Sequence, residues 1–227
     1  LGDASALLFY SPGLSATNIV KVDANNITAT ITAEPTVAPD LHAFRVVTNT
    51  GISNMRLLGV SAMPTVLEAE PNNDFSKPQL IPYNSTVNGV VLSEDVDYFA
   101  VELKAGQKLN VELEGLRLSY LNDFFDPYVA IYDEKRFEIA ASDDSVFLQQ
   151  DCLAAITAPA DGTYIIEVRE SSFGGNERAK YRLHIGGFPR PVAILPSGGP
   201  PGKPLEATCI DALGNQWQET FQMPALA

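Results

Sequence analysis

The sequence predicts an all-β protein made of two β-sandwich domains and a C-terminal tail, on three observations. Glycine and proline contribute 16 residues each to the chain of 227 residues, and both favour turns. Threonine, valine and isoleucine occur in short runs that are typical of strands. No helical periodicity persists past about three turns. With 45% hydrophobic residues, the chain is long enough to bury more than one core.

Residues 1–66 are expected to form the first domain. The run Ile27–Ala33 alternates apolar residues with threonines, which is the pattern of a half-buried strand. Similar runs are Ile19–Val22, Phe44–Val47 and Met55–Val60, and turn-forming segments separate them. About five such strands predict a partial immunoglobulin-like β-sandwich that lacks one or two strands.

The end of this first domain resembles a known family. The run Phe44-Arg-Val-Val-Thr-Asn-Thr-Gly-Ile-Ser-Asn54, followed by a closing strand, resembles the end of bacterial IPT/TIG immunoglobulin-like domains. Such domains usually start with a Pro- and Gly-rich strand pair that is absent here. The resemblance therefore implies that the first strands were removed or come from elsewhere in the chain.

Residues 67–188 are expected to form a second, larger sandwich. The segment Met63–Pro71 carries two prolines and predicts an extended connector into this domain. Phe99–Leu103 and Leu109–Leu113 alternate around an Ala-Gly-Gln turn, which predicts a hairpin. About eight strands in this region predict an antiparallel jelly-roll β-sandwich. The further strands are expected at Tyr128–Tyr132, Phe137–Ala141, Ala154–Thr157, Tyr164–Val168 and Tyr181–Ile185.

Residues 189–227 form a C-terminal tail for which the sequence allows two structural roles. Val192–Leu195 and Leu205–Cys209 have strand patterns, and the Pro- and Gly-rich run Pro196–Gly202 separates them. The tail is expected either to open a further immunoglobulin-like domain or to complete the first one, by strand exchange within the chain or with a second chain. Cys152 and Cys209 are the only cysteines, and they form either a disulfide or two buried thiols.

Charge and hydropathy exclude several classes of partner. The formal net charge is −13 with a pI near 4.5, and no basic cluster with interleaved aromatic residues occurs. A nucleic-acid backbone would be repelled. No apolar run reaches the ~18 residues that a membrane-spanning helix needs. The sequence thus predicts neither a nucleic-acid partner nor membrane insertion.

Catalytic motifs are absent from the sequence. His42 and His184 are the only histidines, they fall in separate expected domains, and no G-x-S-x-G motif accompanies them. The triplet Asp161-Gly-Thr163 precedes a strand and has no second copy, so a turn is the better interpretation than an aspartic-protease site. We therefore expect a non-enzymatic chain.

An acidic connector is the strongest candidate for a binding site. The cluster Glu68–Asp74 is rich in carboxylate and amide oxygens, and Glu94–Asp97 follows about twenty residues later. Hard cations such as Ca²⁺ take six to eight oxygen ligands. Glu68 and Glu70 point the same way in an extended segment, because side chains alternate with a period of two residues. Either one calcium ion collects these oxygens, or they are solvated carboxylates of an acidic protein.

Two other clusters are weaker candidates. Asp143 and Asp144 form either a second cation site or a solvated loop. An aromatic cluster forms either a ligand patch for a polysaccharide or protein, or part of the core. Its members are Tyr120, Phe124, Phe125 and Tyr128.

An ordered set of motifs resembles the bacterial pre-peptidase C-terminal domain over a little more than half of the chain. The motifs are Glu70-Pro-Asn-Asn-Asp74, Asp95-Val-Asp-Tyr-Phe99, Ala105-Gly106, Asp126-Pro-Tyr-Val-Ala-Ile-Tyr132, Asp161-Gly-Thr-Tyr-Ile-Ile-Glu-Val168 and Tyr181-Arg-Leu183. Members of this family are non-catalytic sandwiches attached to secreted peptidases and other surface proteins. In the related collagen-binding domains of clostridial collagenases, the corresponding acidic edge binds calcium. The resemblance thus implies a calcium site made by Glu68, Glu70, Asn72, Asn73, Asp95 and Asp97.

These observations predict a non-catalytic accessory or interaction module of a secreted or surface multidomain bacterial protein, in which calcium orders the linker between domains. The alternative is a carbohydrate-binding or collagen-like protein-binding domain whose calcium is purely structural. The expected partners are other domains of the same chain, an extracellular polysaccharide or protein, or a second chain through strand exchange. The expected location is extracellular, at the cell surface or periplasmic.

Overall fold

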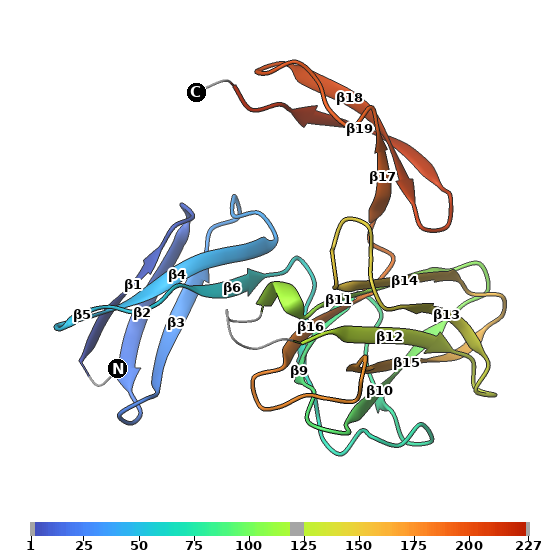
Figure 1. Cartoon of the computed structure of the whole chain (residues 1–227), viewed down its shortest axis with the longest axis horizontal. Helices are drawn as coiled ribbons and strands as arrows, with labels where there is room; N and C mark the ends of the chain where they lie inside the picture. The colour runs from blue at the N-terminus through green and yellow to red at the C-terminus, as the bar shows by residue number, and fades with distance from the viewer. Residues whose placement is uncertain (1–2, 119–124, 226–227) are drawn as a thin grey trace. The chain divides into compact units, whose positions relative to one another are not determined.

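A computed structural model describes residues 3–118 and 125–225 of the chain (Figure 1). The chain divides into two compact units, Leu1–Ala62 and Met63–Ala227. The elements are β-strands apart from one short 3-10 helix, η1 (Leu116–Leu118), so the all-β fold class is confirmed. Within the described ranges, no helix is long and apolar enough to cross a membrane.

The first unit is a thin sandwich of two small sheets. Strand β4 (Asp40–Thr48) pairs with β1, β5 and β6 in one sheet, and β2 pairs with β3 in the other. Of the described residues in this unit, only His42 and Val46 are buried. A cavity of about 590 Å³ remains between apolar residues of the two sheets, among them Ile27 and Phe44. The other strands are β1 (Ala4–Phe9), β2 (Leu14–Lys21), β3 (Ile27–Ala33), β5 (Gly51–Ile52) and β6 (Arg56–Val60).

This arrangement agrees with the expected partial sandwich. The alternation in Ile27–Ala33 does form a strand, and β3 pairs antiparallel with β2. The inner faces are only partly filled because a two-stranded sheet lies over a larger one. The resemblance of this unit to IPT/TIG domains stays a prediction.

The second unit contains a sandwich of two five-stranded sheets. One sheet has the order β13-β12-β15-β10-β8 and the other has the order β14-β11-β16-β9-β7. Most neighbouring strands are antiparallel, whereas β8 runs parallel to β10 and β7 runs parallel to β9. The strands are β7 (Thr65–Leu67), β8 (Gln79–Leu80), β9 (Ser85–Val90), β10 (Val96–Leu103), β11 (Lys108–Glu114), β12 (Pro127–Tyr132), β13 (Glu138–Ser142), β14 (Cys152–Thr157), β15 (Gly162–Glu170) and β16 (Lys180–Gly186).

The core of this sandwich comes from the alternation that the sequence shows. Phe99 and Ile166 from one sheet and Leu109 and Leu183 from the other are completely buried, and they belong to one continuous apolar cluster. Burying an aliphatic or aromatic side chain stabilises the fold by about 1.5–3 kcal/mol relative to leaving it exposed. The residues between them in β10, β12 and β15 point to the opposite, outer face of their sheet.

The predicted hairpin of Phe99–Leu103 and Leu109–Leu113 is wrong. Strand β10 pairs with β15 and β8, whereas β11 pairs with β14 and β16 in the other sheet. A turn, in which Gln107 N donates to Lys104 O at 2.9 Å, carries the chain from one sheet to the other. The alternation of apolar and polar residues shows which side of a strand faces the core, but it does not show which strand lies next to it in the sheet. The sequence pattern therefore fits both arrangements.

Asp151 anchors the loop before β14 with a completely buried carboxylate. Its Oδ1 accepts hydrogen bonds from Gly115 N at 3.0 Å and Leu116 N at 2.7 Å. Its Oδ2 accepts a hydrogen bond from Arg117 Nε. The guanidinium of Arg117 also contacts Glu112 at 2.9 Å, so the buried charges are paired.

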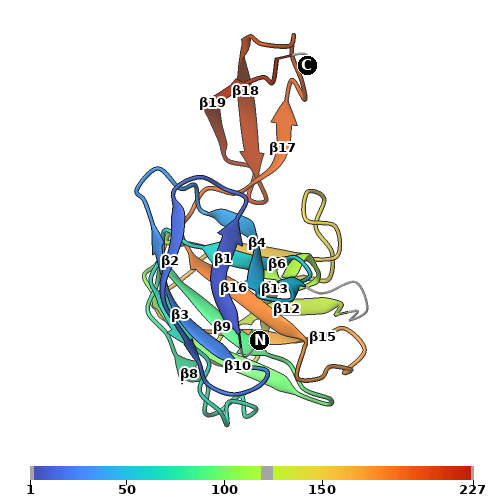
Figure 2. The same ribbon diagram turned by 90° about the vertical axis from the view of Figure 1, so that its left-hand side faces the viewer.

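The C-terminal residues form a three-stranded antiparallel sheet of their own. Strands β17 (Pro191–Leu195), β18 (Pro204–Asp211) and β19 (Gln216–Gln222) lie side by side in that order, as Figure 2 shows. Cys209 in β18 and Cys152 in the sandwich are both buried free thiols. Strand exchange with the first domain, and the predicted boundaries at 66/67 and 188/189, stay predictions.

Candidate metal centre

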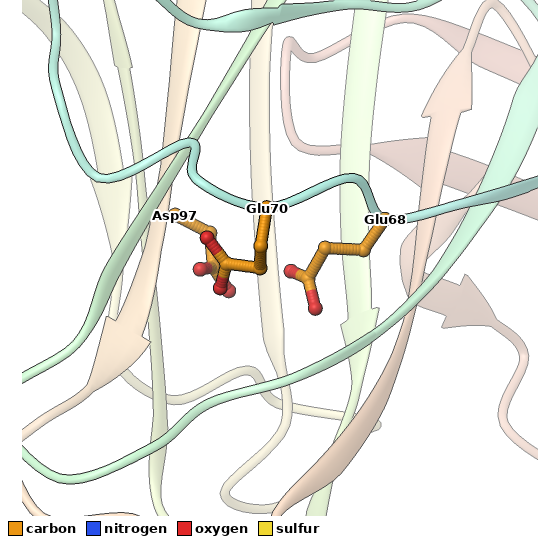
Figure 3. A group of neighbouring side chains, drawn as sticks. All are labelled: Glu68, Glu70 and Asp97. Carbon is orange, nitrogen blue, oxygen red and sulfur yellow. The ribbon is translucent and has the colours of Figure 1, made fainter.

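Three carboxylates gather at one end of the sandwich. Oxygen atoms of Glu68, Glu70 and Asp97 all lie within 4.8 Å of one another. Figure 3 shows Glu68 and Glu70 reaching from the connector towards Asp97, which comes from strand β10. Half of the six predicted ligands therefore meet at one point.

Glu68 reaches this point because the connector runs as a strand beside β9. Strand β7 pairs with β9 in parallel, and Glu68 N continues the pairing by donating to Asn88 O at 3.0 Å. The side chain then turns back, and its Oε2 accepts a hydrogen bond from Val90 N at 3.0 Å. Both the main chain and the side chain of Glu68 are thus fixed by the sheet edge.

Gly89 makes room for this arrangement. An added Cβ at Gly89 would overlap the phenol group of Tyr181 and lie 2.7 Å from Oε1 of Glu68. Tyr181 is the residue opposite Gly89 on strand β16. A side chain at position 89 would therefore force Glu68 or Tyr181 to move.

The hydroxyl of Tyr181 lies between two of the carboxylates. It is 2.9 Å from Oδ2 of Asp97, and it donates a hydrogen bond to Oε1 of Glu68. A phenol has a single proton, so Glu68 and Asp97 share one donor, and a further proton or a cation is needed to relieve the negative charge between them. Burial raises the pKa of Asp97 to about 9, with a further contribution from the negative charge of Glu68.

Several buried atoms at this site have no partner within the protein. Asn72 is 1% exposed and Asp97 is completely buried. In the described part of the chain, four buried side-chain nitrogen or oxygen atoms lack a hydrogen bond, and three of them are Asn72 Oδ1, Asn72 Nδ2 and Asp97 Oδ1. Unsatisfied buried polar atoms are costly and call for an explanation such as a bound ion or water. Oxygen atoms dominate the set, which suits a hard cation.

Glu70 is the most exposed of the three carboxylates. Its Oε2 accepts a hydrogen bond from Asn72 N at 3.0 Å. Partial burial raises the pKa of Glu70, and the negative charges of Asp95 and Glu68 raise it further. Clustered negative charge of this kind is relieved by a proton or by a cation.

The remaining predicted ligands form an adjoining pair. Asn73 Nδ2 donates to Oδ1 of Asp95, and Oδ2 of Asp95 accepts from Leu92 N at 3.0 Å. Asp95 is 5% exposed. Asn73 and Asp95 therefore form a hydrogen-bonded pair, and both carboxylate oxygens of Asp95 already accept a hydrogen bond within the protein.

Part of the chain matches a known protein family. Residues 95–170 match the family model of the bacterial pre-peptidase C-terminal domain. This part of the chain is therefore similar to pre-peptidase C-terminal domains. The matched region starts at Asp95 and runs through β15, so the resemblance inferred from the sequence motifs is confirmed. No match to the chain was found among the curated proteins.

Solved structures similar to this chain share little sequence with it. The pre-peptidase C-terminal domain of Bacillus anthracis collagenase is 14% identical with a TM-score of 0.38, and the alignment covers 48% of this chain and 93% of that one. The Aeromonas hydrophila protein PliG, a periplasmic inhibitor of g-type lysozyme, is 17% identical with a TM-score of 0.37 and coverages of 48% and 95%. The Bacteroides ovatus protein SGBP-B, solved with a mixed-linkage heptasaccharide, is 8% identical with a TM-score of 0.22 and coverages of 74% and 67%.

Of the predicted aromatic patch, the structure describes Phe125 and Tyr128 and places them on different sides of the sandwich wall. Phe125 is 1% exposed and lies in the core, so it is not available to a surface ligand. An aromatic ring in this position is buried for the usual reason that it contributes a large apolar area. Tyr128 lies on strand β12 with its side chain on the outer face. Tyr120 and Phe124 lie outside the described residues.

Sequence reasoning missed two residues of the candidate metal centre. Tyr181 lies in the run Tyr181-Arg-Leu183, which resembles the pre-peptidase C-terminal domain, but its hydroxyl reaches Glu68 and Asp97 only after three distant segments meet. Gly89 carries no chemical signal of its own. A glycine within a run of strand-forming residues is nevertheless a sign of close approach by another group, and this sign was available in the sequence.

Proposed function

We propose that this chain is a calcium-dependent accessory module of a secreted or surface multidomain bacterial protein. Pre-peptidase C-terminal domains are non-catalytic accessory domains, and the calcium role is our addition. The observation that carries it is the meeting of Glu68, Glu70 and Asp97 beside the unsatisfied side chain of Asn72. A divalent cation at this point would take oxygen ligands from these residues and remove the need for the proton on Asp97.

Calcium suits this donor set better than zinc or copper. The donors are carboxylate and amide oxygens, and neither cysteine lies among them. Softer metals select nitrogen and sulfur ligands. Magnesium demands a tighter octahedral geometry and keeps several waters, whereas calcium accepts six to eight oxygens in irregular arrangements.

The ion would act on the segment that follows β7, inside the second unit. Glu68 and Glu70 belong to the segment between β7 and β8, whereas Asp97 belongs to β10. A cation held by both parts would tie the connector to the sandwich. Because such an ion binds only the folded arrangement, it stabilises that arrangement by about 2.7 kcal/mol at a hundredfold excess over Kd.

Thermal unfolding with calcium and with EGTA tests this function. We expect a higher Tm in calcium for the unmodified chain and no difference between the two conditions for Glu70→Gln. Glu177→Gln is the matched control, because Glu177 is an exposed carboxylate outside the cluster. Equal melting temperatures of the unmodified chain in calcium and EGTA would refute the calcium role.

A second candidate function is a carbohydrate- or protein-binding domain with purely structural calcium. The outer face of the β13-β12-β15-β10-β8 sheet favours it, because tyrosine and arginine side chains cluster there. Retention of the chain on insoluble polysaccharides or collagen, with and without EGTA, distinguishes the two functions. Retention that persists in EGTA supports the second one.

The domain type supports a location outside the cytoplasm. Pre-peptidase C-terminal domains occur in secreted bacterial proteins. Extracellular fluid supplies the calcium that a site of moderate affinity needs. We therefore place the parent protein in the extracellular space, at the cell surface or in the periplasm. Fractionation of the producing cells, with detection of the full-length protein, tests this placement.

A further inference from the structure

The outer face of the β13-β12-β15-β10-β8 sheet carries an aromatic cluster distinct from the metal centre. Tyr98 on β10 and Tyr128 and Tyr132 on β12 lie on the side of their strands opposite the core residues Phe99, Val129 and Ile131. Each tyrosine is half-buried. We call these three residues, together with Phe75, Glu167, Arg169 and Phe173, the tyrosine face.

The rings of the tyrosine face contact one another. Phe75 packs edge-on against Tyr98, with ring centroids 5.5 Å apart, and against Tyr132, with centroids 5.7 Å apart. The guanidinium of Arg136 lies 4.6 Å from the centre of the Phe75 ring. These contacts hold the rings in place before any ligand arrives, which lowers the entropy lost on binding.

Polar groups between the rings are held in place as well. Glu167 accepts hydrogen bonds from Arg169 Nε at 3.1 Å and from Tyr98 Oη at 3.4 Å. Arg169 in turn lies 3.9 Å from the ring centre of Tyr128 and 4.6 Å from that of Phe173. The face thus alternates apolar ring surface with fixed hydrogen-bonding groups.

Arginine side chains offset part of the negative charge around the tyrosine face. Arg169 is bonded to Glu167, the neighbouring Arg136 lies over Phe75, and Tyr128 Oη lies 3.4 Å from Glu138 Oε2. The whole chain has a net charge of −13, so two arginines gathered here stand out. An anionic ligand would still meet the carboxylates, whereas a neutral ligand would meet no repulsion.

The tyrosine face spans several strands of its sheet. The cavity of the first unit and the hollow near Val146 are lined by other residues. Small molecules favour concave sites that enclose most of their surface. A row of rings and hydrogen-bonding groups across a sheet suits an extended chain.

We propose that the tyrosine face binds a neutral polysaccharide. Sugar rings present apolar C–H faces to the aromatic rings and hydroxyl groups to Glu167, Arg169 and the tyrosine hydroxyls. This inference rests on the proposed role as a binding module, but it does not require calcium at the metal centre. Tyr98 N donates to Asn72 O at 3.0 Å, so the connector and the face touch, and calcium adds to the binding only by holding Phe75 in place.

Retention on insoluble polysaccharides tests the proposal with the full chain. Cellulose, chitin and xylan serve as neutral probes, and insoluble collagen serves as the protein probe. We expect retention on at least one of the three polysaccharides, and binding about tenfold weaker, equivalent to about 1.4 kcal/mol, for Tyr98→Ala and for Tyr132→Ala. Phe147→Ala is the control, because Phe147 is an aromatic residue 53% exposed outside this face.

Control measurements distinguish a loss of polysaccharide binding from a loss of folding or of calcium binding. Each variant is melted in parallel. If an alanine variant fails to fold, Tyr132→Phe, which keeps the ring, and Arg169→Gln, which keeps a polar side chain, replace it. The proposal is overturned by absence of retention on all three polysaccharides, by equal retention of the tyrosine variants and the unmodified chain, or by retention on collagen alone. If the chain binds polysaccharide in EGTA but its Tm does not depend on calcium, the polysaccharide proposal is supported and the calcium role is refuted.

Discussion

The hydroxyl of Tyr181 lies 2.9 Å from Oδ2 of Asp97 and also donates to Oε1 of Glu68, so two carboxylates share a single phenol proton. Burial raises the pKa of Asp97 to about 9, so the metal-free site is expected to hold a proton on Asp97 at neutral pH. A cation that binds Asp97 must displace this proton. The metal-free and the calcium-bound forms of the site are therefore expected to differ in protonation.

The substitution Asp97→Asn tests whether calcium needs the negative charge of Asp97. Asparagine keeps a hydrogen-bond donor towards Tyr181 but has no negative charge for a cation. We expect the variant in EGTA to melt at or above the Tm of the unmodified chain in EGTA, and calcium to cause no further increase. Thermal melts in both conditions measure this. If the Asp97→Asn variant still gains stability from calcium, the ion binds elsewhere.

The stability of the metal-free protein is expected to fall as the pH rises. The pKa of Asp97 is raised from an ordinary value of 3.8 to about 9 in the folded chain. Between these values the folded chain keeps a proton that the unfolded chain has lost, so the unfolding free energy decreases with pH. Stability due to this proton is complete below pH 3.8 and is lost as the pH passes about 9.

Calcium should reverse this dependence. Because calcium and the proton compete for Asp97, calcium affinity is expected to increase over the same pH range. Urea unfolding in EGTA and in calcium, at several pH values, measures both effects. Asp97→Asn serves as the control for titration of other groups, and an identical pH dependence in the variant and the unmodified chain contradicts the assignment to Asp97.

The substitution Gly89→Ala should damage the site and the fold together. Its Cβ would lie 2.7 Å from Oε1 of Glu68 and overlap Tyr181. Overpacking of this kind destabilises a fold by about 1–3 kcal/mol, and the displaced Glu68 should also weaken calcium binding. Urea unfolding provides the measurement. Gly198→Ala is the matched control, because an added Cβ there meets nothing within 4 Å, and similar losses for the two variants would refute the crowding at position 89.

Removing the carboxylate of Asp151 should destabilise the sandwich without affecting calcium. Asp151→Ala leaves two backbone N–H groups without their buried acceptor and removes one of the carboxylate partners of Arg117, which keeps Glu112. Breaking a buried ion pair by removal of one partner costs about 3–5 kcal/mol. Urea unfolding is expected to show a loss of this size, with the calcium-dependent increase in stability unchanged. A loss of the size seen for the exposed Glu177→Gln would contradict the structural role.

The sequence predicts the strands and the location of the acidic site, because both leave local patterns. The alternation in Ile27–Ala33 and the motifs from Asp95 onward identify elements that the structure contains. Sheet partners are not local. The alternation of β10 and β11 fits a hairpin and a crossover between sheets equally, and only packing of the whole core decides between them.

The details of the site depend on contacts between distant segments. Tyr181 lies 113 residues from Glu68 in the chain, so no spacing rule brings them together. The burial of Phe125 could not be predicted from the sequence either, because an aromatic residue next to a strand can belong to the core or to the surface. Asn72 and Asp97 were chosen from the sequence as oxygen donors, but only the structure reveals that their atoms lack partners.

Calorimetric titration of calcium into the metal-free chain at neutral pH tests whether the three carboxylates bind the ion. We expect saturable binding at the site of Glu68, Glu70 and Asp97, with the release of a proton that makes the measured heat depend on the ionisation enthalpy of the buffer. The same titration should give no saturable heat for Asp97→Asn and an unchanged isotherm for Glu177→Gln. Absence of binding to the unmodified chain, or equal binding to Asp97→Asn, would rule out calcium at this site.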